Sequence, residues 1–170
     1  FKKIVDCKIL FFVISIPFLI GVVSPAKADT ALDSSNWHGT TGDHWWNIDE
    51  PGSYYLDVEG QIFSTTHNHA IRIACSNVVL DGRGKTITGA GSPASPSETG
   101  PDVYGVRVNA GGPSSDVTVK NLIVEKKFYG VIFEAVANGV IDAVNTGDNN
   151  FGIYLWDTDN NTISDNISNN

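Results

Sequence analysis

The sequence predicts an all-β fold, a right-handed single-stranded parallel β-helix in which short strands wind into a stack of coils. Three observations lead to this prediction. An aromatic–Gly–apolar–any–apolar segment recurs, with its glycines 25 and 22 residues apart. Between the copies, apolar and polar residues alternate over three to five positions and are then interrupted by Gly, Asn, Asp or Ser, the pattern of short strands joined by turns. Beyond residue 28, no segment has the helical spacing of apolar residues.

Residues 1–28 have the layout of a secretory signal peptide. Three lysines lie in the first eight positions, an uncharged apolar run covers 9–23, and Ala26 and Ala28 supply the small residues of a cleavage site. The alternative is an uncleaved membrane anchor, but the run is shorter than the ~20 residues that a spanning helix needs, and it contains Pro17. We therefore predict cleavage after Ala28 and a protein that is secreted, at the cell surface or periplasmic.

Cleavage would make an acidic chain more acidic. Residues 1–28 hold four lysines and one aspartate, so their removal moves the formal net charge from −8 to −11. Such a surface repels nucleic acid and anionic lipid. We expect no nucleic-acid partner, a monomer, and membrane contact only through the signal peptide or a C-terminal anchor outside this sequence. Cys75 is the one cysteine that remains, so an intrachain disulfide is not expected.

Residues 29–69 are predicted to form an N-terminal cap together with the strand that leads into the first coil. Their tryptophans, Trp37, Trp45 and Trp46, would cover the apolar end of the coil stack. Residues 70–170 are predicted to be coils of the β-helix, incomplete at Asn170 because the sequence stops inside the repeat.

The coils are marked by two alternating sets of strand-like segments. The first set contains the aromatic–Gly mark and covers 104–108, 129–133 and 151–155, with 70–73 as a degenerate earlier copy; the second set covers 78–82, 117–122, 140–144 and 162–167. A strand this short cannot bury a face alone, so each is expected to stack about 4.8 Å from its equivalent in the next coil. Val106, Val131 and Ile153 should then be vertical neighbours in one core, and the glycine should permit the bend into each strand.

The last coil carries a specific resemblance. FGIYL at 151–155, followed by DNNTISDNISNN at 159–170, resembles the repeat of the NosD-like, or carbohydrate-binding and sugar-hydrolase (CASH), superfamily of parallel β-helices. EPGSYYL at 50–56 and VVLDGRGKTITG at 78–89 are similar to the opening of its exported members, so the resemblance covers about residues 48–170. The superfamily includes copper-site maturation proteins, polysaccharide lyases, epimerases and surface proteins. The resemblance therefore implies a fold more than a function.

The outward side chains of the first set of strands give the main candidate site. One predicted column contains Arg72, Arg107, Ile132 and Tyr154, and the adjacent one contains Ala74, Asn109, Glu134 and Trp156. Tyr154 and Trp156 share a face and could form an aromatic platform for a sugar ring. The candidate ligand-binding residues are Arg72, Arg107, Glu134, Tyr154 and Trp156, with a polysaccharide or cell-surface glycan as partner. The alternative is a face that a loop covers or that only stabilises the strands.

Two histidines form a candidate metal site. His67 and His69 would face the same way on a strand, at a spacing that can ligate Cu or Zn, and His38 and His44 belong to the cap. The resemblance to NosD-like proteins implies copper. The sequence nevertheless offers no third ligand, Met or thiolate cluster beside the pair, and such histidines are more often solvated.

Catalytic residues are not assigned. Lyases and epimerases use clustered carboxylates, with or without Ca²⁺, beside a base. The acids here are scattered at turns, although Asp142 and Asp165 occupy comparable turns and could approach one another. Two glycosylation sequons begin at Asn160 and Asn166, and we expect Asn166 to lie in the strand ladder.

The leading hypothesis is an exported, non-catalytic β-helix that recognises a polysaccharide or cell-surface glycan. One alternative is a polysaccharide lyase, epimerase or hydrolase of the β-helix class. A second is a NosD-like periplasmic copper-handling protein. No cofactor is assigned, Ca or Cu being those that the alternatives would require.

Overall fold

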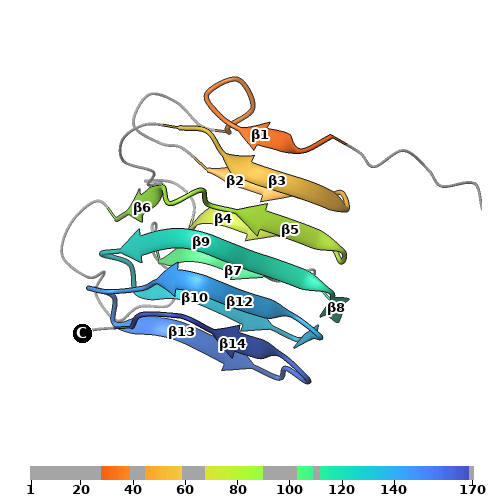
Figure 1. Cartoon of the computed structure of the whole chain (residues 1–170), viewed down its shortest axis with the longest axis vertical. Helices are drawn as coiled ribbons and strands as arrows, with labels where there is room; N and C mark the ends of the chain where they lie inside the picture. The colour runs from red at the N-terminus through yellow and green to blue at the C-terminus, as the bar shows by residue number, and fades with distance from the viewer. Residues whose placement is uncertain (1–27, 39–44, 59–67, 90–102, 109–111, 169–170) are drawn as a thin grey trace, which may run out of the picture.

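A computed structural model describes residues 28–38, 45–58, 68–89, 103–108 and 112–168. In these ranges the chain forms strands and turns without a helix, and every pairing between named strands is parallel. The strands stack in successive layers, from β1 (Thr30–Leu32) at one end to β13 (Phe151–Trp156) and β14 (Thr162–Ser164) at the other (Figure 1). The predicted parallel β-helix is confirmed. The predicted signal peptide falls on residues 1–27, outside the described residues, apart from its last position.

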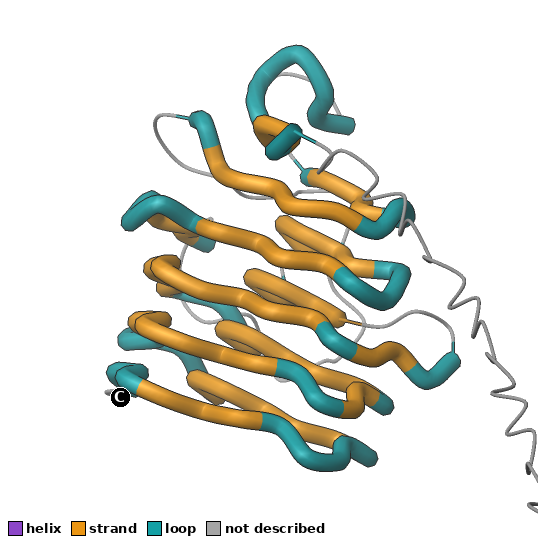
Figure 2. The backbone as a smooth tube through the Cα atoms, turned by 45° about the vertical axis from the view of Figure 1, so that its right-hand side comes forward, coloured by secondary structure: helices purple, strands orange, loops and turns teal. Residues whose placement is uncertain are grey.

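Two main sheets face one another across the core (Figure 2). The first sheet has the order β1-β3-β5-β9-β12-β14, with β6 also paired to β9; its remaining members are β3 (Gly52–Leu56), β5 (Val78–Asp81), β6 (Thr86–Thr88), β9 (Val117–Glu125) and β12 (Val140–Asn145). The second sheet has the order β13-β10-β7-β4-β2; its remaining members are β10 (Tyr129–Glu134), β7 (Tyr104–Val108), β4 (His69–Ile73) and β2 (Trp46–Ile48). A short third sheet pairs β8 (Ser114–Ser115) with β11 (Val136–Ala137).

The register of the second sheet is the one that the repeat predicts. Val131 is the partner of both Val106 and Ile153, and Val106 is also the partner of Ile71. The N-terminal strands continue the same ladders, because Trp46 pairs with Ile71 and β1 pairs with β3. The segment predicted as a cap therefore also contributes strands to both main sheets.

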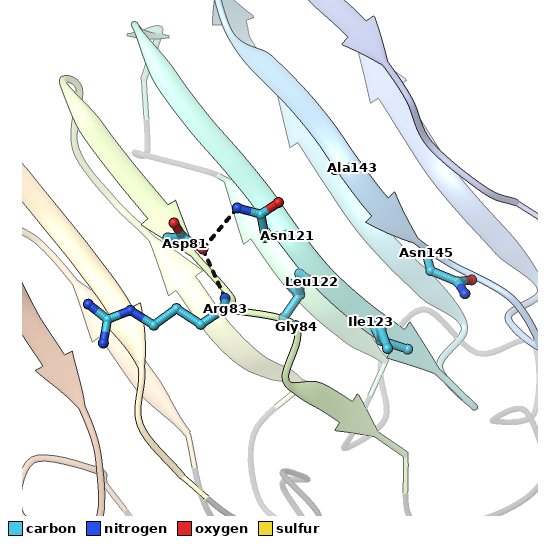
Figure 3. A pocket seen from close by; sticks show the side chains of 8 residues that line it. All are labelled: Asp81, Arg83, Gly84, Asn121, Leu122, Ile123, Ala143 and Asn145. Atoms are coloured by element: carbon cyan, nitrogen blue, oxygen red, sulfur yellow. Dashed lines mark hydrogen bonds between the residues drawn. The ribbon is translucent and has the colours of Figure 1, made fainter.

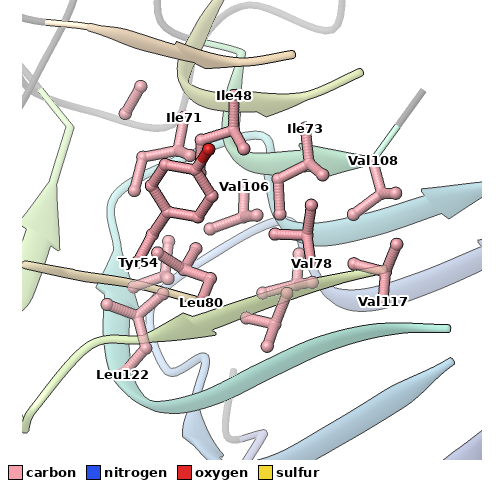
Figure 4. Packing of buried hydrophobic residues seen from close by; sticks show 14 of the residues in the cluster. Ile48, Tyr54, Ile71, Ile73, Val78, Leu80, Val106, Val108, Val117 and Leu122 are labelled. Atoms are coloured by element: carbon pink, nitrogen blue, oxygen red, sulfur yellow. The ribbon is translucent and has the colours of Figure 1, made fainter. Parts of the chain in front are cut away.

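The core lies between the two main sheets and consists of the inward side chains of both. Figure 4 shows Val, Ile and Leu side chains from successive coils packed together, with Tyr54 at one side of the cluster. Val106 and Val131 are fully buried, as are Val119 and Ile141 from the first sheet. Burial of each such side chain stabilises the fold by about 1.5–3 kcal/mol relative to exposure. A short strand is therefore stable only because the neighbouring coil covers its apolar face.

The corners between strands also repeat with the coil. Several non-glycine residues have left-handed backbone angles, and many of them recur at intervals of 22 residues: Lys126 and Asp148; Ala135 and Asp157; Asp116, Asn138 and Asn160; and Asn121, Ala143 and Asp165. This conformation costs about 1–2 kcal/mol for a residue with a side chain. The corners of adjacent coils bond to one another, as in the Lys126 N–H to Asp148 carbonyl bond of 3.0 Å, so stacking offsets the cost.

Three asparagine side chains join adjacent coils in the same way. In each, Oδ1 accepts from a backbone N–H 22 residues earlier and Nδ2 donates to a carbonyl 25 residues earlier; the three are Asn149, Asn161 and Asn166. Each side-chain amide thus substitutes for a peptide group in the ladder. Asn166, which was expected to lie in the strand ladder, follows β14 and joins the ladder through its side chain.

The repeated glycines are required for space. Among the described glycines only Gly52 and Gly84 have positive φ, so Gly105 and Gly130 do not need a left-handed backbone. A Cβ on Gly105 would lie 2.6 Å from the Gly130 carbonyl oxygen and would collide with Val124. The repeated glycines were predicted to let the chain bend into each strand. Their actual role is to let adjacent coils approach closely.

Candidate functional site

The outer face of the second sheet carries the predicted column of side chains. Arg72 pairs with Arg107, which pairs with Ile132, which pairs with Tyr154. Asn47 extends this column by one strand, because it pairs with Arg72. In the adjacent column Glu134 pairs with Trp156, while Asn109 falls outside the described residues.

Three of the predicted site residues surround one hollow, which we call the near hollow. It has a volume of about 290 Å³ and is lined by Arg107, Glu134, Ala135, Trp156 and Asp157. Strand β7 supplies Arg107, β10 ends with Glu134, and β13 ends with Trp156. Ala135 and Asp157 are the left-handed corners that follow these two strands, whose last residues, Glu134 and Trp156, are register partners.

An ion pair fixes the polar side of the near hollow. Arg107 Nε donates to Glu134 Oε2 over 2.9 Å, and Nη2 donates to Oε1 over 3.3 Å. Such a two-pronged contact holds both planar groups in one orientation. Arg107 also lies over the Tyr104 ring, with Cζ 4.7 Å from the ring centroid. The indole of Trp156 lines the near hollow beside this rigid pair, so an aromatic surface adjoins oriented polar groups.

The other two predicted residues lie elsewhere on the same face. Tyr154 packs against Tyr129 and Phe151, with ring centroids 5.3 and 5.9 Å away, and does not line the near hollow. Ile132, expected to point outward, is buried in a small cluster outside the main core with Tyr104, Tyr129 and others. This cluster is structural, since its aromatic members are almost fully covered.

Arg72 lines a second hollow, which we call the far hollow. Its volume is about 510 Å³, and the residues around it are His38, Trp45, Asn47, Asp49, His69 and Arg72. Arg72 Nη1 donates to Asn47 Oδ1 over 3.1 Å. The Trp45 indole stacks on His38 at 4.6 Å and meets the edge of His69 at 5.4 Å. Asn47, Asp49 and Asp157 were not among the predicted site residues, although an alignment of WNI at 46–48 with IRI at 71–73 would have placed Asn47 beside Arg72.

The described residues do not form a metal centre. In the ranges that the structure describes, no three His, Cys, Asp or Glu side chains are grouped closely enough to hold an ion. His69 is buried with Nδ1 2.9 Å from Asn68 Oδ1, and its predicted companion His67 falls outside the described residues. Burial, followed by the charges of Asp49 and Glu50, raises the pKa of the Cys75 thiol, which disfavours the thiolate that binds soft metals.

A third hollow lies on the first sheet, at the corner between β5 and β6. Figure 3 shows Asp81 accepting hydrogen bonds from the Arg83 N–H at 2.9 Å and from Asn121 Nδ2 at 3.2 Å. Lys120 Nζ lies 3.5 Å from the same carboxylate, and the Arg83 guanidinium covers the Tyr55 ring at 3.3 Å. Burial alone would raise the pKa of Asp81, but these hydrogen bonds and Lys120 lower it overall. The polar groups here bond mainly to one another, so they stabilise a corner.

Asp142 and Asp165 were expected to occupy comparable turns, but the register partner of Asp142 is the residue before Asp165. Asp142 pairs with Ser164, and Ser164 Oγ donates to Asp142 Oδ1 over 2.6 Å. Asp165 occupies the left-handed corner that follows. At the sequons, Asn160 is exposed, whereas the side chain of Asn166 bonds to the preceding coil.

Comparison with known proteins gives one match. A family model described as "NosD: Periplasmic copper-binding protein (NosD)" matches residues 43–170. No curated protein and no solved structure matches the chain. In the part of the chain that the structure describes, no helix has the length and apolar character that crossing a bilayer requires.

Proposed function

Since the chain belongs to the NosD family of periplasmic β-helix proteins, we propose that it is an exported recognition module that binds a glycan at the near hollow. The observation that carries this proposal is the position of Trp156 beside the Arg107–Glu134 pair in the lining of one hollow. An indole offers a flat apolar surface to the C–H face of a sugar ring, and adjacent planar polar groups can bond to the hydroxyls at its rim.

The polar side of the hollow suits hydroxyl groups. A guanidinium has five N–H donors, of which Glu134 takes two, so Arg107 has further donors for a ligand. Glu134 and Asp157 supply carboxylate acceptors. Because Arg107 and Glu134 hold each other in place, little side-chain entropy is lost when a ligand binds.

The experiment is a glycan-array screen with the full chain, followed by calorimetry on the best ligand. Trp156→Ala should weaken binding at least about tenfold, equivalent to about 1.4 kcal/mol, and Trp156→Phe should weaken it less because a ring remains. Tyr55→Ala, which removes an aromatic ring from the first sheet, should leave the affinity unchanged. An empty wild-type array, or identical profiles for wild type and Trp156→Ala, would end the proposal.

Copper handling, which the description of the family model names, is a different function with a different test. The described residues do not fit a copper centre, because they contain no group of three His, Cys, Asp or Glu side chains that could hold the ion. Calorimetric titration of the full chain with Cu(I) and Cu(II) decides the matter. A site tighter than micromolar that His69→Ala abolishes would favour copper over the glycan.

A further inference from the structure

The near and far hollows lie on the same face and are joined by one column of side chains. The near hollow uses β7, β10 and β13, and the far hollow uses β4 and β2. Strands β7 and β4 are neighbours, and Arg107 of the near hollow is the register partner of Arg72 of the far hollow. The two hollows therefore follow one another along the stacking direction.

The distance between the outermost strands of the two hollows sets the length that a ligand needs to contact both. From β13 to β2 there are four strand intervals, which amounts to about 19 Å at about 4.8 Å per interval. A single sugar ring covers only a small part of that length. An extended oligosaccharide matches it, because its rings succeed one another along a line as the strands do.

Both hollows offer similar chemistry. In the far hollow, the exposed His38 ring stacks on Trp45, and Asn47 and Arg72 form a bonded pair beside them. In the near hollow, Trp156 adjoins the Arg107–Glu134 pair. Each hollow thus combines an aromatic ring with fixed planar polar groups, the combination that suits a sugar with its flat C–H face and its rim of hydroxyls.

The charge of the face selects among polysaccharides. Two arginines, Arg72 and Arg107, are opposed by three carboxylates, Asp49, Glu134 and Asp157. The whole chain has a formal net charge of −8. A polyanionic chain such as a polyuronate would be repelled by this surface, whereas an uncharged chain would not.

We propose that the two hollows are subsites for one extended, uncharged polysaccharide, which lies along the stacking direction with its chain crossing the Arg107–Arg72 column. This inference rests on the proposed glycan-binding function and extends it to the length and charge of the ligand. The near hollow holds one end of the bound segment, and the far hollow adds affinity only when the segment is long enough to reach it.

The test uses the full chain and calorimetric titration with an uncharged disaccharide, tetrasaccharide and hexasaccharide of the type that the array identifies. Affinity should rise at least about tenfold from disaccharide to hexasaccharide. Asn47→Ala and His38→Ala should each lower hexasaccharide affinity several-fold and have little effect on the disaccharide, whereas Trp156→Ala should weaken both. Arg83→Ala on the first sheet serves as the control, and thermal unfolding confirms that each variant is folded.

The outcomes separate the two proposals. If the wild type binds no saccharide of any length, the glycan-binding function itself is wrong. If the wild type binds disaccharide and hexasaccharide equally well and the far-hollow variants change neither, glycan binding stands and the two-subsite inference is overturned. Tighter binding of a polygalacturonate oligomer than of the uncharged one would overturn the assignment of ligand charge.

Discussion

Arg72 and Arg107 are register partners on adjacent parallel strands, yet each bonds away from the other. Arg72 Nη1 donates to Asn47 on β2 at 3.1 Å, and Arg107 Nε donates to Glu134 on β10 at 2.9 Å. Like charges directly opposite one another in a sheet are destabilising. The two partners draw the guanidinium groups in opposite directions along the stack, which relieves the repulsion and places one cation in each hollow.

Loss of the Glu134 carboxylate should destabilise the fold, because it removes the partner that holds Arg107 away from Arg72. Glu134→Gln removes the negative charge from a partly buried pair whose side chains are 24% and 13% exposed. We expect the free energy of unfolding to fall by about 1 kcal/mol, as for well-oriented pairs near a surface. A double-mutant cycle with Arg107→Gln, measured by urea unfolding, should give a coupling energy of about 0.5–1 kcal/mol. Additive losses would show that the pair contributes nothing to stability.

The asparagine bridges should contribute strongly to stability. Asn149 is 4% exposed, accepts from the Lys127 N–H and donates to the Val124 carbonyl of the preceding coil. Asn149→Ala leaves both backbone groups buried without this partner, which should cost about 2–4 kcal/mol in urea unfolding. The adjacent Asn150→Ala, at an exposed position, should change stability by less than about 0.5 kcal/mol. Equal effects of the two variants would contradict the bridging role.

The close approach of the coils at the repeated glycines can be tested with a single methyl group. In Gly130→Ala the new Cβ would lie 2.5 Å from the Gly152 carbonyl oxygen, and overpacking of this kind costs about 1–3 kcal/mol. A Cβ on Gly112 would meet nothing within 4 Å, so Gly112→Ala is the matched control and should be close to neutral. Equal melting temperatures for the two variants would refute the steric explanation.

Acid should weaken the corner at Asp81. Its pKa is lowered in the folded chain from the ordinary value of 3.8, so its contribution to stability is present above that value and is lost as the pH falls through the folded-state pKa. Asp81→Asn should unfold at lower urea concentration than the wild type at pH 7. The difference between the two should shrink only below about pH 4. A difference that stays constant from neutral to strongly acidic pH would exclude this linkage.

The strand register could be predicted because each repeat begins with the same short sequence, an aromatic residue followed by glycine. The aromatic and glycine at 104–105, 129–130 and 151–152 align the second sheet, and with it the pairing of Arg72 with Arg107. The pairing of Trp46 with Ile71 was not predicted, since residues 29–49 lack that sequence. Asp142 was expected to approach Asp165 because both were predicted to lie at turns, but Asp142 lies in β12 and a strict 22-residue repeat leads to Ser164.

The predicted site residues are divided between two hollows and an aromatic cluster. This division could not be predicted, because it depends on the direction in which each outward side chain turns. Tyr154 and Trp156 share a face by alternation, but the Tyr154 ring turns to Tyr129 and Phe151 while Trp156 lines the near hollow. Arg72 and Arg107 stack in one column, and their different bonding partners place them in different hollows. Periodicity gives the face on which a residue lies, whereas the neighbours of its side chain decide its role.

The most direct test of glycan binding on the outer face of the second sheet is a nuclear magnetic resonance titration of the isotopically labelled chain with the bound saccharide. We predict shifted signals for the side chains of Arg72 and Arg107 and for the indole N–H of Trp156, with the signals of Asp81, Arg83 and Asn121 unchanged. Shifts that cluster around Asp81 and Arg83 on the first sheet, or no shifts at saturating saccharide, would contradict the account.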